Sequence, residues 1–335
     1  MLRLILVMLP VVVIASVEVC ARVVFSLKYG VPGHVYGTMK YDPVLGAVPK
    51  ANSYSLNAHL NDYGFRNSEN VIDPKPADAL RVIAYGGSTT YCHHLKNDQA
   101  WPIRLQELLR QASGGRDQVL NGGVIMWSLG HSFEKAKRDV PLLKPDAVII
   151  YTGVNEMYNA SGLATQGLRI HDLVARREYG RFTTALELNT PFRDVISYKL
   201  LRDFVVGPLR KALRIGGAVD SELQAGVVNP DILTNYLETL HSFVNFLREH
   251  GVKPVFVKEV FDASHPDQVT MRRLTGYSAA AANVAATWGA VVVDPTDAFH
   301  ERSATSTLFQ ETGVHVTVAG ANLMASVVYD QAFRK

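Results

Sequence analysis

The chain has 335 residues, of which 47% are hydrophobic and 19% charged, enough to bury the core of one large domain or two small ones. Its formal net charge of +3 excludes the strongly basic composition of nucleic-acid-binding proteins, so nucleic acid is not an expected partner. Cys20 and Cys92 lie far apart and lack the spacing of metal ligands, so neither a structural disulfide nor a metal or other cofactor is predicted.

The N-terminal segment, residues 1–28, is predicted to be a transmembrane anchor. One early charge, Arg3, precedes an apolar run from Leu4 to Val17, and apolar residues continue to Leu27. The segment reaches the roughly 20 residues that a membrane-spanning helix requires. A cleaved signal peptide is the competing interpretation. No clean small-x-small cleavage site follows the run, so an uncleaved anchor is favoured.

Charged residues near the end of this segment bear on its environment. Glu18 and Arg22 are four positions apart and share one helix face, so they could pair at the membrane interface or against a partner helix. The simpler interpretation, which we favour, places both in the headgroup zone. Positive charge on both flanks leaves the orientation open. Since anchors at the extreme N-terminus most often precede exported domains, we expect the domain on the periplasmic or extracellular face.

Residues 29–80 are predicted to be an irregular lead-in that packs on the domain, and residues 81–335 to be an α/β domain. Short apolar runs rich in β-branched residues alternate with helical patterns, which is typical of strands buried on both faces of a parallel sheet. We therefore predict a three-layer, doubly wound parallel sheet. The expected strands are 81–86, 118–123, 146–153, 253–260 and 290–294; the expected helices are Gln99–Gln111, His131–Leu143, Asp231–His250, Pro266–Trp288 and one from Val316 onward.

One segment interrupts this alternation. Residues 159–230 form a long, basic insertion between two predicted strands. Such an insertion is usually a lid or a docking surface, and its positive charge also suits anionic lipid. The equally weighted alternative is a solvated helical excursion with ordinary surface charge.

Four short motifs follow predicted strands or precede the last helix. They are GGST at 86–89, NGG at 121–123, GVNE at 153–156 and GVH at 313–315. Together, and in this order, they resemble the four sequence blocks of the SGNH (GDSL-type) hydrolases. The stretch YDPVLGAVPKANSYSLNAHLNDYGFRN, from Tyr41 to Asn67, resembles the lead-in of membrane-anchored members of that family. The resemblance implies a flavodoxin-like SGNH hydrolase fold.

The resemblance also implies catalytic roles that agree with elementary chemistry. A serine hydroxyl needs a base within hydrogen-bond reach, so Ser88 is the expected nucleophile and His315 its base. The oxyanion of a tetrahedral intermediate needs two or three donors, which the Ser88 N–H, the Gly123 N–H and the Asn155 amide would supply. Glycine at position 123 is expected because a Cβ would keep the backbone from the substrate oxygen.

The chain departs from the family at the acid that orients the histidine. That acid usually lies three residues before the histidine, where this chain has Thr312. Either Glu311 takes the role, which is our prediction, or the site is a Ser–His dyad with a backbone carbonyl on the imidazole. Asp294 is a second candidate, although its place at a strand end fits a cap or turn residue better.

Three further residues attract a functional interpretation. Arg66 in the lead-in is a predicted substrate contact at the mouth of the site, with a structural ion pair as the alternative. His93 and His94 resemble a metal pair, but adjacent side chains diverge and no carboxylate has a matching spacing, so no metal site is predicted.

The leading functional hypothesis is a membrane-anchored serine acyl-ester enzyme that works through an acyl-Ser88 intermediate. With water as acceptor it would be an esterase, and with a sugar hydroxyl an O-acyltransferase; the expected substrates are acylated carbohydrate or small esters outside the cytoplasm. The alternative is a catalytically weak accessory subunit of a membrane complex. Nucleotide binding ranks third because the glycines lack a Walker lysine and a GxGxxG pattern.

Overall fold

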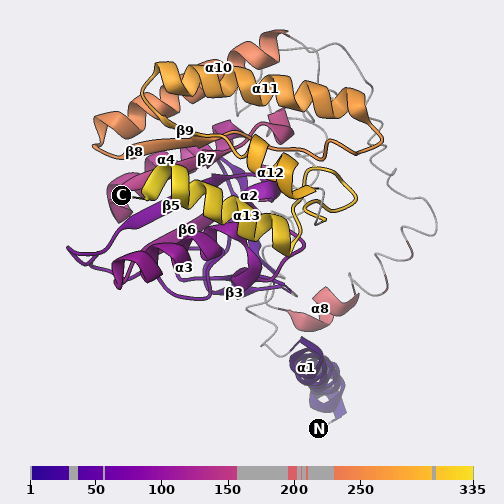
Figure 1. Ribbon diagram of the computed structural model, residues 1–335. Helices are drawn as coiled ribbons and strands as arrows, with labels where there is room; N and C mark the ends of the chain where they lie inside the picture. The colour runs from indigo at the N-terminus through magenta and orange to yellow at the C-terminus, as the bar shows by residue number, and fades with distance from the viewer. Residues whose placement is uncertain are drawn as a thin grey trace.

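The computed structural model describes residues 2–29, 37–55, 57–156, 195–201, 205, 209, 230–303 and 307–334. Its centre is a five-stranded parallel sheet with the strand order β6-β5-β7-β8-β9 (Figure 1). This order reverses direction at β5, as in doubly wound sheets, and confirms the predicted fold class. The strands are β5 (Arg81–Gly86), β6 (Gln118–Gly123), β7 (Ala147–Tyr151), β8 (Lys253–Val257) and β9 (Val291–Val293).

β9 is shorter than predicted by one residue at each end, and β7 and β8 end early. β7 ends before Gly153, whose φ of +152° lies outside the extended backbone of a strand. β8 ends at Val257, two residues before a glutamate whose side chain turns toward the strand ends. Both deviations occur at the carboxyl edge of the sheet, where the chain leaves its regular path around the candidate site.

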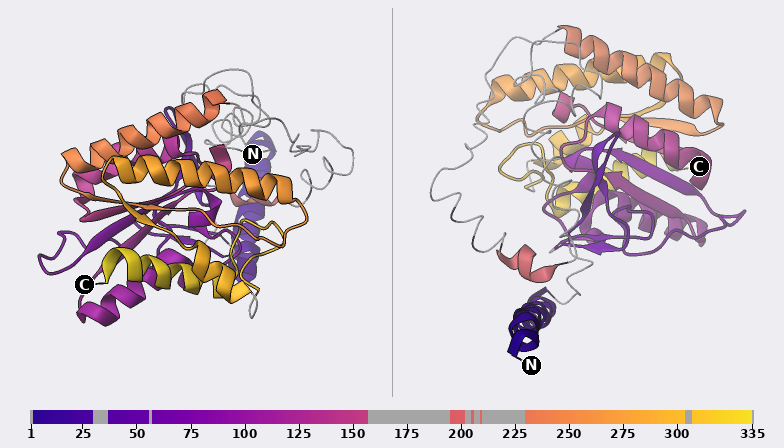
Figure 2. Two further views of the ribbon diagram at one scale, coloured as in Figure 1. Left: turned by 45° about the horizontal axis from the view of Figure 1, so that its top comes forward. Right: turned by 180° about the vertical axis from the view of Figure 1, so that it is seen from behind.

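Helices cover both faces of the sheet. Alternate residues of β5 point to opposite sides: Ile83 and Tyr85 belong to one core cluster and Val82 and Ala84 to the other. Because both faces are covered, every β5 residue is buried, which explains its continuous apolar run. The first face carries α4 (Leu129–Leu143), α10 (Pro230–Glu249) and α11 (Gln268–Thr287); the second carries α3 (Trp101–Ser113), α12 (Thr296–Ser303) and α13 (Val318–Val328) (Figure 2).

The lead-in is more regular than its sequence suggests. It contains two small antiparallel pairs, β1 (Met39–Asp42) with β2 (Gly46–Pro49) and β3 (Ser53–Tyr54) with β4 (His59–Leu60). Strands of two to four residues are too short to show an alternating pattern. The lead-in is fastened to the sheet by Asn67, whose side chain donates to the Val119 carbonyl and accepts from the Asn121 N–H, both at 2.9 Å. It therefore covers the open edge of β6.

The N-terminal helix α1 (Leu2–Tyr29) projects from the domain (Figure 1). Its stretch Met8–Leu27 has a mean hydropathy of 2.1 and is long and apolar enough to cross a membrane, which suits an anchor or a signal sequence. Arg22 and Glu18, for which the sequence left pairing as an alternative, form an ion pair at 2.9 Å.

The second half of α1 also contacts a helix that the sequence did not predict. Glu18 accepts the N–H groups of Ile196 and Ser197, both at 2.9 Å, at the start of α8 (Ile196–Leu201). Ile196 packs on Ala21 and Phe25. α8 thus lies against α1. Of the predicted insertion, 159–230, the structure describes residues 195–201, 205, 209 and 230.

Candidate active site

The candidate site lies at the carboxyl ends of β5, β6 and β7. Gly86, the last residue of β5, pairs in register with Gly123 of β6 and with Tyr151 of β7. The short helix α2 (Ser88–Tyr91) follows one residue later. In open parallel sheets, ligands bind at this edge, beside the point where the strand order reverses. The motifs that follow these strands therefore meet where a ligand is expected.

Two glycines bring the Ser88 turn close to its neighbours. A Cβ on Gly86 would lie 2.1 Å from the Tyr151 carbonyl oxygen and 2.2 Å from Thr90 Oγ1. A Cβ on Gly87 would lie 2.4 Å from Asn155 Nδ2. Real Cβ atoms do not approach so closely, so glycine is required at both positions. The turn can thereby place Ser88 at the first position of α2, beside Asn155.

His315 reaches Ser88 from the loop before α13. Its Nε2 lies 2.9 Å from Ser88 Oγ. The loop is fixed by the hydrogen bond from the Gln310 N–H to the His315 carbonyl, at 2.8 Å, and by the bridge between Phe309 and Val316. The imidazole is thus held within proton-transfer distance of the hydroxyl.

The other imidazole nitrogen contacts a residue that differs from our prediction. Thr312 Oγ1 lies 2.9 Å from His315 Nδ1. Glu311 is exposed, and in the described part of the chain no hydrogen bond joins it to His315. Thr312, the next residue, takes the position expected for Glu311. The orienting partner is therefore a neutral hydroxyl, neither a carboxylate nor a backbone carbonyl.

Asp294, the second acid considered, also lies elsewhere. Its carboxylate accepts the Thr296 N–H at 3.0 Å and pairs with Lys258 at 2.9 Å. The interpretation of Asp294 as a cap or turn residue is confirmed, because it satisfies an N–H at the start of α12.

Burial changes the acid–base properties of His315. Burial is the largest factor that lowers its pKa, to about 4, and the neighbouring His94 and His93 lower it further. The His94 ring stands perpendicular to the His315 ring, with centroids 5.5 Å apart. His315 is therefore neutral at physiological pH, as a base must be. His94, discounted as a metal ligand, is part of the immediate surroundings of the base.

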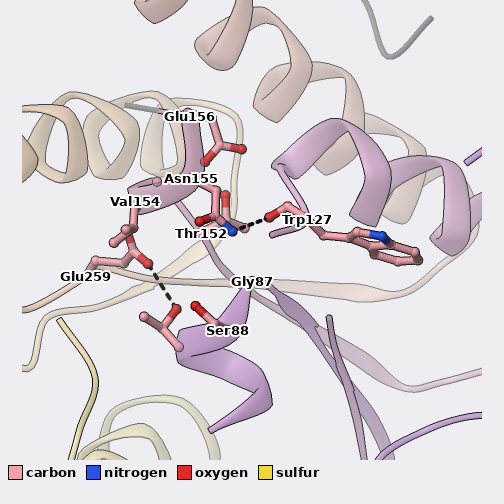
Figure 3. A pocket seen from close by; sticks show the side chains of 10 residues that line it. Gly87, Ser88, Trp127, Thr152, Val154, Asn155, Glu156 and Glu259 are labelled. Carbon is pink, nitrogen blue, oxygen red and sulfur yellow. Dashed lines mark hydrogen bonds between the residues drawn. The ribbon is translucent and has the colours of Figure 1, made fainter. Parts of the chain in front are cut away.

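Asn155 is placed to donate to an oxyanion, and so is the main chain of Ser88. Asn155 Nδ2 donates one hydrogen bond to the Trp127 carbonyl, at 2.7 Å, which orients the amide beside Gly87 (Figure 3). The amide has a second N–H that this bond does not use. Ser88 is the first residue of α2, where an N–H has no carbonyl partner within the helix. Asn155 and Ser88 line the same pocket.

Gly123 does not have the role that the sequence predicted. Its N–H donates to Asn121 Oδ1 at 3.0 Å. A Cβ there would lie 2.3 Å from the Tyr91 nitrogen and 2.7 Å from the Thr90 carbonyl carbon. Glycine is needed at this position because α2 packs directly on the end of β6. The residue supports the nucleophile helix, and its N–H is already bonded within the chain.

Arg66 is also not a substrate contact. Its side chain is 1% exposed, and its guanidinium donates to the carbonyls of Tyr91, Cys92, Leu95 and Asn57. The guanidinium also lies over the Tyr91 ring, 4.5 Å from its centroid. Arg66 therefore joins the lead-in to the end of α2, from inside the protein. Neither predicted alternative, a contact at the mouth or an ion pair, describes it.

The pocket beside Ser88 contains two buried carboxyl groups. It is lined by Glu156 and Glu259 as well as by Ser88, Asn155 and Trp127 (Figure 3). Burial raises the pKa of Glu156 to about 7. Burial, and then the neighbouring Glu156, raise the pKa of Glu259 to about 8. Sequence reasoning missed Glu259, and the available signal was a lone acid at the end of an apolar strand.

A family model supports the fold assignment. The model of a family described as GDSL-like lipase/acylhydrolase matches residues 84–323. Similar solved structures include LAE5, described as an alpha/beta hydrolase enzyme from the metagenome of Lake Arreo, Spain, with 15% identity, a TM-score of 0.49, and coverage of 75% of this chain and 94% of that one. They also include Axe2, described as an acetylxylan esterase from Geobacillus stearothermophilus, with 15% identity, a TM-score of 0.48 and coverage of 76% and 95%. No curated protein matches the chain.

Proposed function

The chain belongs to the GDSL-like lipase/acylhydrolase family, and from this premise we propose that it is a serine ester enzyme whose nucleophile is Ser88. The observation that carries the proposal is the 2.9 Å separation between His315 Nε2 and Ser88 Oγ. A hydroxyl becomes an effective nucleophile only when a base can take its proton during attack.

The proposed reaction has two stages. In the first, His315 takes the Ser88 proton while Oγ attacks the ester carbonyl, and the Ser88 N–H and the Asn155 amide stabilise the oxyanion. The imidazolium then gives that proton to the departing alcohol, which leaves an acyl-Ser88. In the second stage, His315 takes a proton from the acceptor hydroxyl as it attacks the acyl group. The imidazolium then returns that proton to Ser88 Oγ as the acyl–oxygen bond breaks, which restores both residues. Thr312 keeps the proton of the neutral imidazole on Nδ1 throughout, so that Nε2 can accept.

We further propose the substrates and the location. The substrates we propose are acylated carbohydrate or small esters, whose carbonyl would lie between Ser88 and Asn155 at the strand ends. The acceptor is water, or a sugar hydroxyl if the enzyme transfers the group to carbohydrate. We assign α1 as an uncleaved anchor with the domain on the exported side of the membrane, because its apolar stretch is long enough to span.

A fluorophosphonate probe tests the proposal, because it labels serines that a neighbouring base activates. The full chain should be labelled, and Ser88→Ala and His315→Ala should not. Ser303→Ala, which changes an exposed serine at the end of α12, should be labelled like the wild type.

A second candidate function is favoured by the Thr312 hydroxyl on His315, where the family usually has an acid. It is an accessory subunit of a membrane complex, with little catalysis of its own. A wild-type chain that the probe does not label, and that cleaves no p-nitrophenyl acetate, would support this candidate and refute the enzyme.

A further inference from the structure

Glu259 lies between the two segments that carry Ser88 and Asn155. Its Oε2 accepts the Val154 N–H at 2.8 Å, one residue before Asn155. Its Oε1 accepts from Thr89 Oγ1 at 3.3 Å, one residue after Ser88 (Figure 3). A single side chain from the end of β8 is thus hydrogen-bonded to the neighbours of both groups.

The surroundings hold this carboxyl group in place. Glu259 is 3% exposed, and its main-chain N–H donates to Ser278 Oγ of α11 at 2.6 Å. A Cβ on Gly153 would lie 2.7 Å from Glu259 Oε2, so the glycine leaves the space that the carboxyl group fills. A fully enclosed side chain with fixed partners transmits the position of one loop to the other.

We infer that Glu259 is a positioning residue that sets the distance between Ser88 and the Asn155 amide. The inference rests on the proposed function, since it concerns the same reaction. Oxyanion donors are effective only when they are aimed in advance at the atom that becomes charged. The Glu259 side chain thus adds a second link between the Ser88 helix and the Asn155 segment, beside the hydrogen bond from Thr90 Oγ1 to the Tyr151 carbonyl at 3.1 Å.

The protonation state of the Glu259 carboxyl group predicts a pH dependence of the activity. The groups that face Glu259 are Thr89 of α2, Glu156 after β7, Tyr151 of β7 and Tyr236 of α10. None of them is a cation that would neutralise an ionised carboxylate. With a pKa of about 8, Glu259 is mostly neutral at pH 7 and ionises above pH 8. Its negative charge then opposes the oxyanion that forms in the same pocket.

Three variants of the full chain test the positioning role, with p-nitrophenyl acetate as substrate. Glu259→Ala removes both contacts and should lower kcat roughly 10- to 100-fold with KM little changed, because misplaced groups affect the transition state most. Thr89→Val removes one contact from the opposite side, and should lower kcat by a smaller factor. The double variant should lose less than the product of the two factors, since both changes break one bridge. Ser278→Ala is the matched control. It removes a buried hydrogen bond from the Glu259 main chain but leaves the carboxyl contacts, and its kcat should stay within about threefold of wild type.

Glu259→Gln tests this pH dependence. The amide keeps a carbonyl oxygen for the Val154 N–H but cannot ionise, so activity at pH 7 should resemble wild type. Above pH 8 the wild-type kcat/KM should fall, and the Glu259→Gln variant should stay level.

The outcomes separate this inference from the proposed function. If fluorophosphonate labels the wild type and Glu259→Ala keeps the wild-type kcat, the inference is overturned while the enzyme stands. If Glu259→Ala does not fold, judged by near-ultraviolet circular dichroism, Thr89→Val decides alone: an unchanged kcat overturns the inference. A Glu259→Gln variant as inactive as Glu259→Ala at pH 7 also overturns it. A wild type that is not labelled instead refutes the proposed function.

Discussion

His315 Nε2 and Ser88 Oγ lie 2.9 Å apart although 227 positions separate the residues in sequence. The sheet places the serine just after the end of β5, and the loop before α13 brings the imidazole to it. Both residues are thereby held by well-packed elements, which is what a proton-transfer pair requires.

Thr312 should contribute to activity, and Glu311 should not. Thr312→Val removes the hydroxyl that contacts His315 Nδ1. Because one hydrogen bond that orients the base is lost, kcat/KM should fall roughly tenfold. Glu311→Gln should have no effect in the same ester assay. A larger loss of kcat/KM in Glu311→Gln than in Thr312→Val would instead show that Glu311 orients His315, as the sequence suggested.

The low pKa of His315 predicts activity that persists into acid. The neutral imidazole is the active form, so a pKa of about 4 means that kcat/KM is lost only as the pH falls through that value. His94→Phe keeps a ring against His315 but removes a group that becomes cationic, so the pKa should rise and the acid limb should move to higher pH. His300→Gln, on the exposed α12, is the control and should leave the profile in place. An acid limb near pH 6.5 in the wild type would contradict the geometry around the base.

Asn155→Ala should lower kcat roughly 10²- to 10³-fold, which is the usual effect of one lost oxyanion donor. KM should change little, because the contact forms fully only in the transition state. Steady-state kinetics with p-nitrophenyl acetate would measure both. A raised KM with an unchanged kcat would instead make Asn155 a binding residue.

Arg66→Met should destabilise the fold. The substitution leaves four carbonyls at the end of α2 and in the lead-in without their donor, and should lower the free energy of unfolding by about 3 kcal/mol in urea. Arg116→Met, which loses only an exposed pair with Asp78 at 3.7 Å, should cost less than about 1 kcal/mol. If Arg66→Met kept wild-type stability and raised KM, the original assignment as a substrate contact would be right.

The two interpretations of α1 predict different mature proteins. An anchor should leave residues 1–28 in place and resist extraction from membranes with alkaline carbonate. A signal sequence should be removed, which intact-protein mass spectrometry would show as a shorter, extractable chain. We expect the first result, because the helix is long enough to span and lacks a clean cleavage site.

The parts of the structure that the sequence predicted are those set by local pattern. β5 and β6 have the predicted bounds. Each is a short, continuous apolar run that ends in glycines, and such a run marks the two ends of a buried strand clearly. Ser88 and Asn155 lie together because parallel strands end at one edge. The helix α12 was not predicted, because its eight residues are mostly polar and bury only Phe299.

The parts that could not be predicted depend on side chains meeting in space. The Gly123 N–H is bonded by Asn121, two residues earlier, and only the rotamer of that asparagine decides this. Thr312 and Glu311 are adjacent, and the conformation of one turn selects between them. Arg66 and Glu259 are charged residues that a sequence pattern assigns to the surface, yet both are buried with polar partners.

The base follows every strand of the sheet in the order of synthesis. A chain emerging from the ribosome therefore contains the proposed nucleophile, Asn155 and all the strands before it contains His315. The proposed Ser88–His315 pair can form only after the C-terminal loop has been synthesised and has folded onto the strand ends.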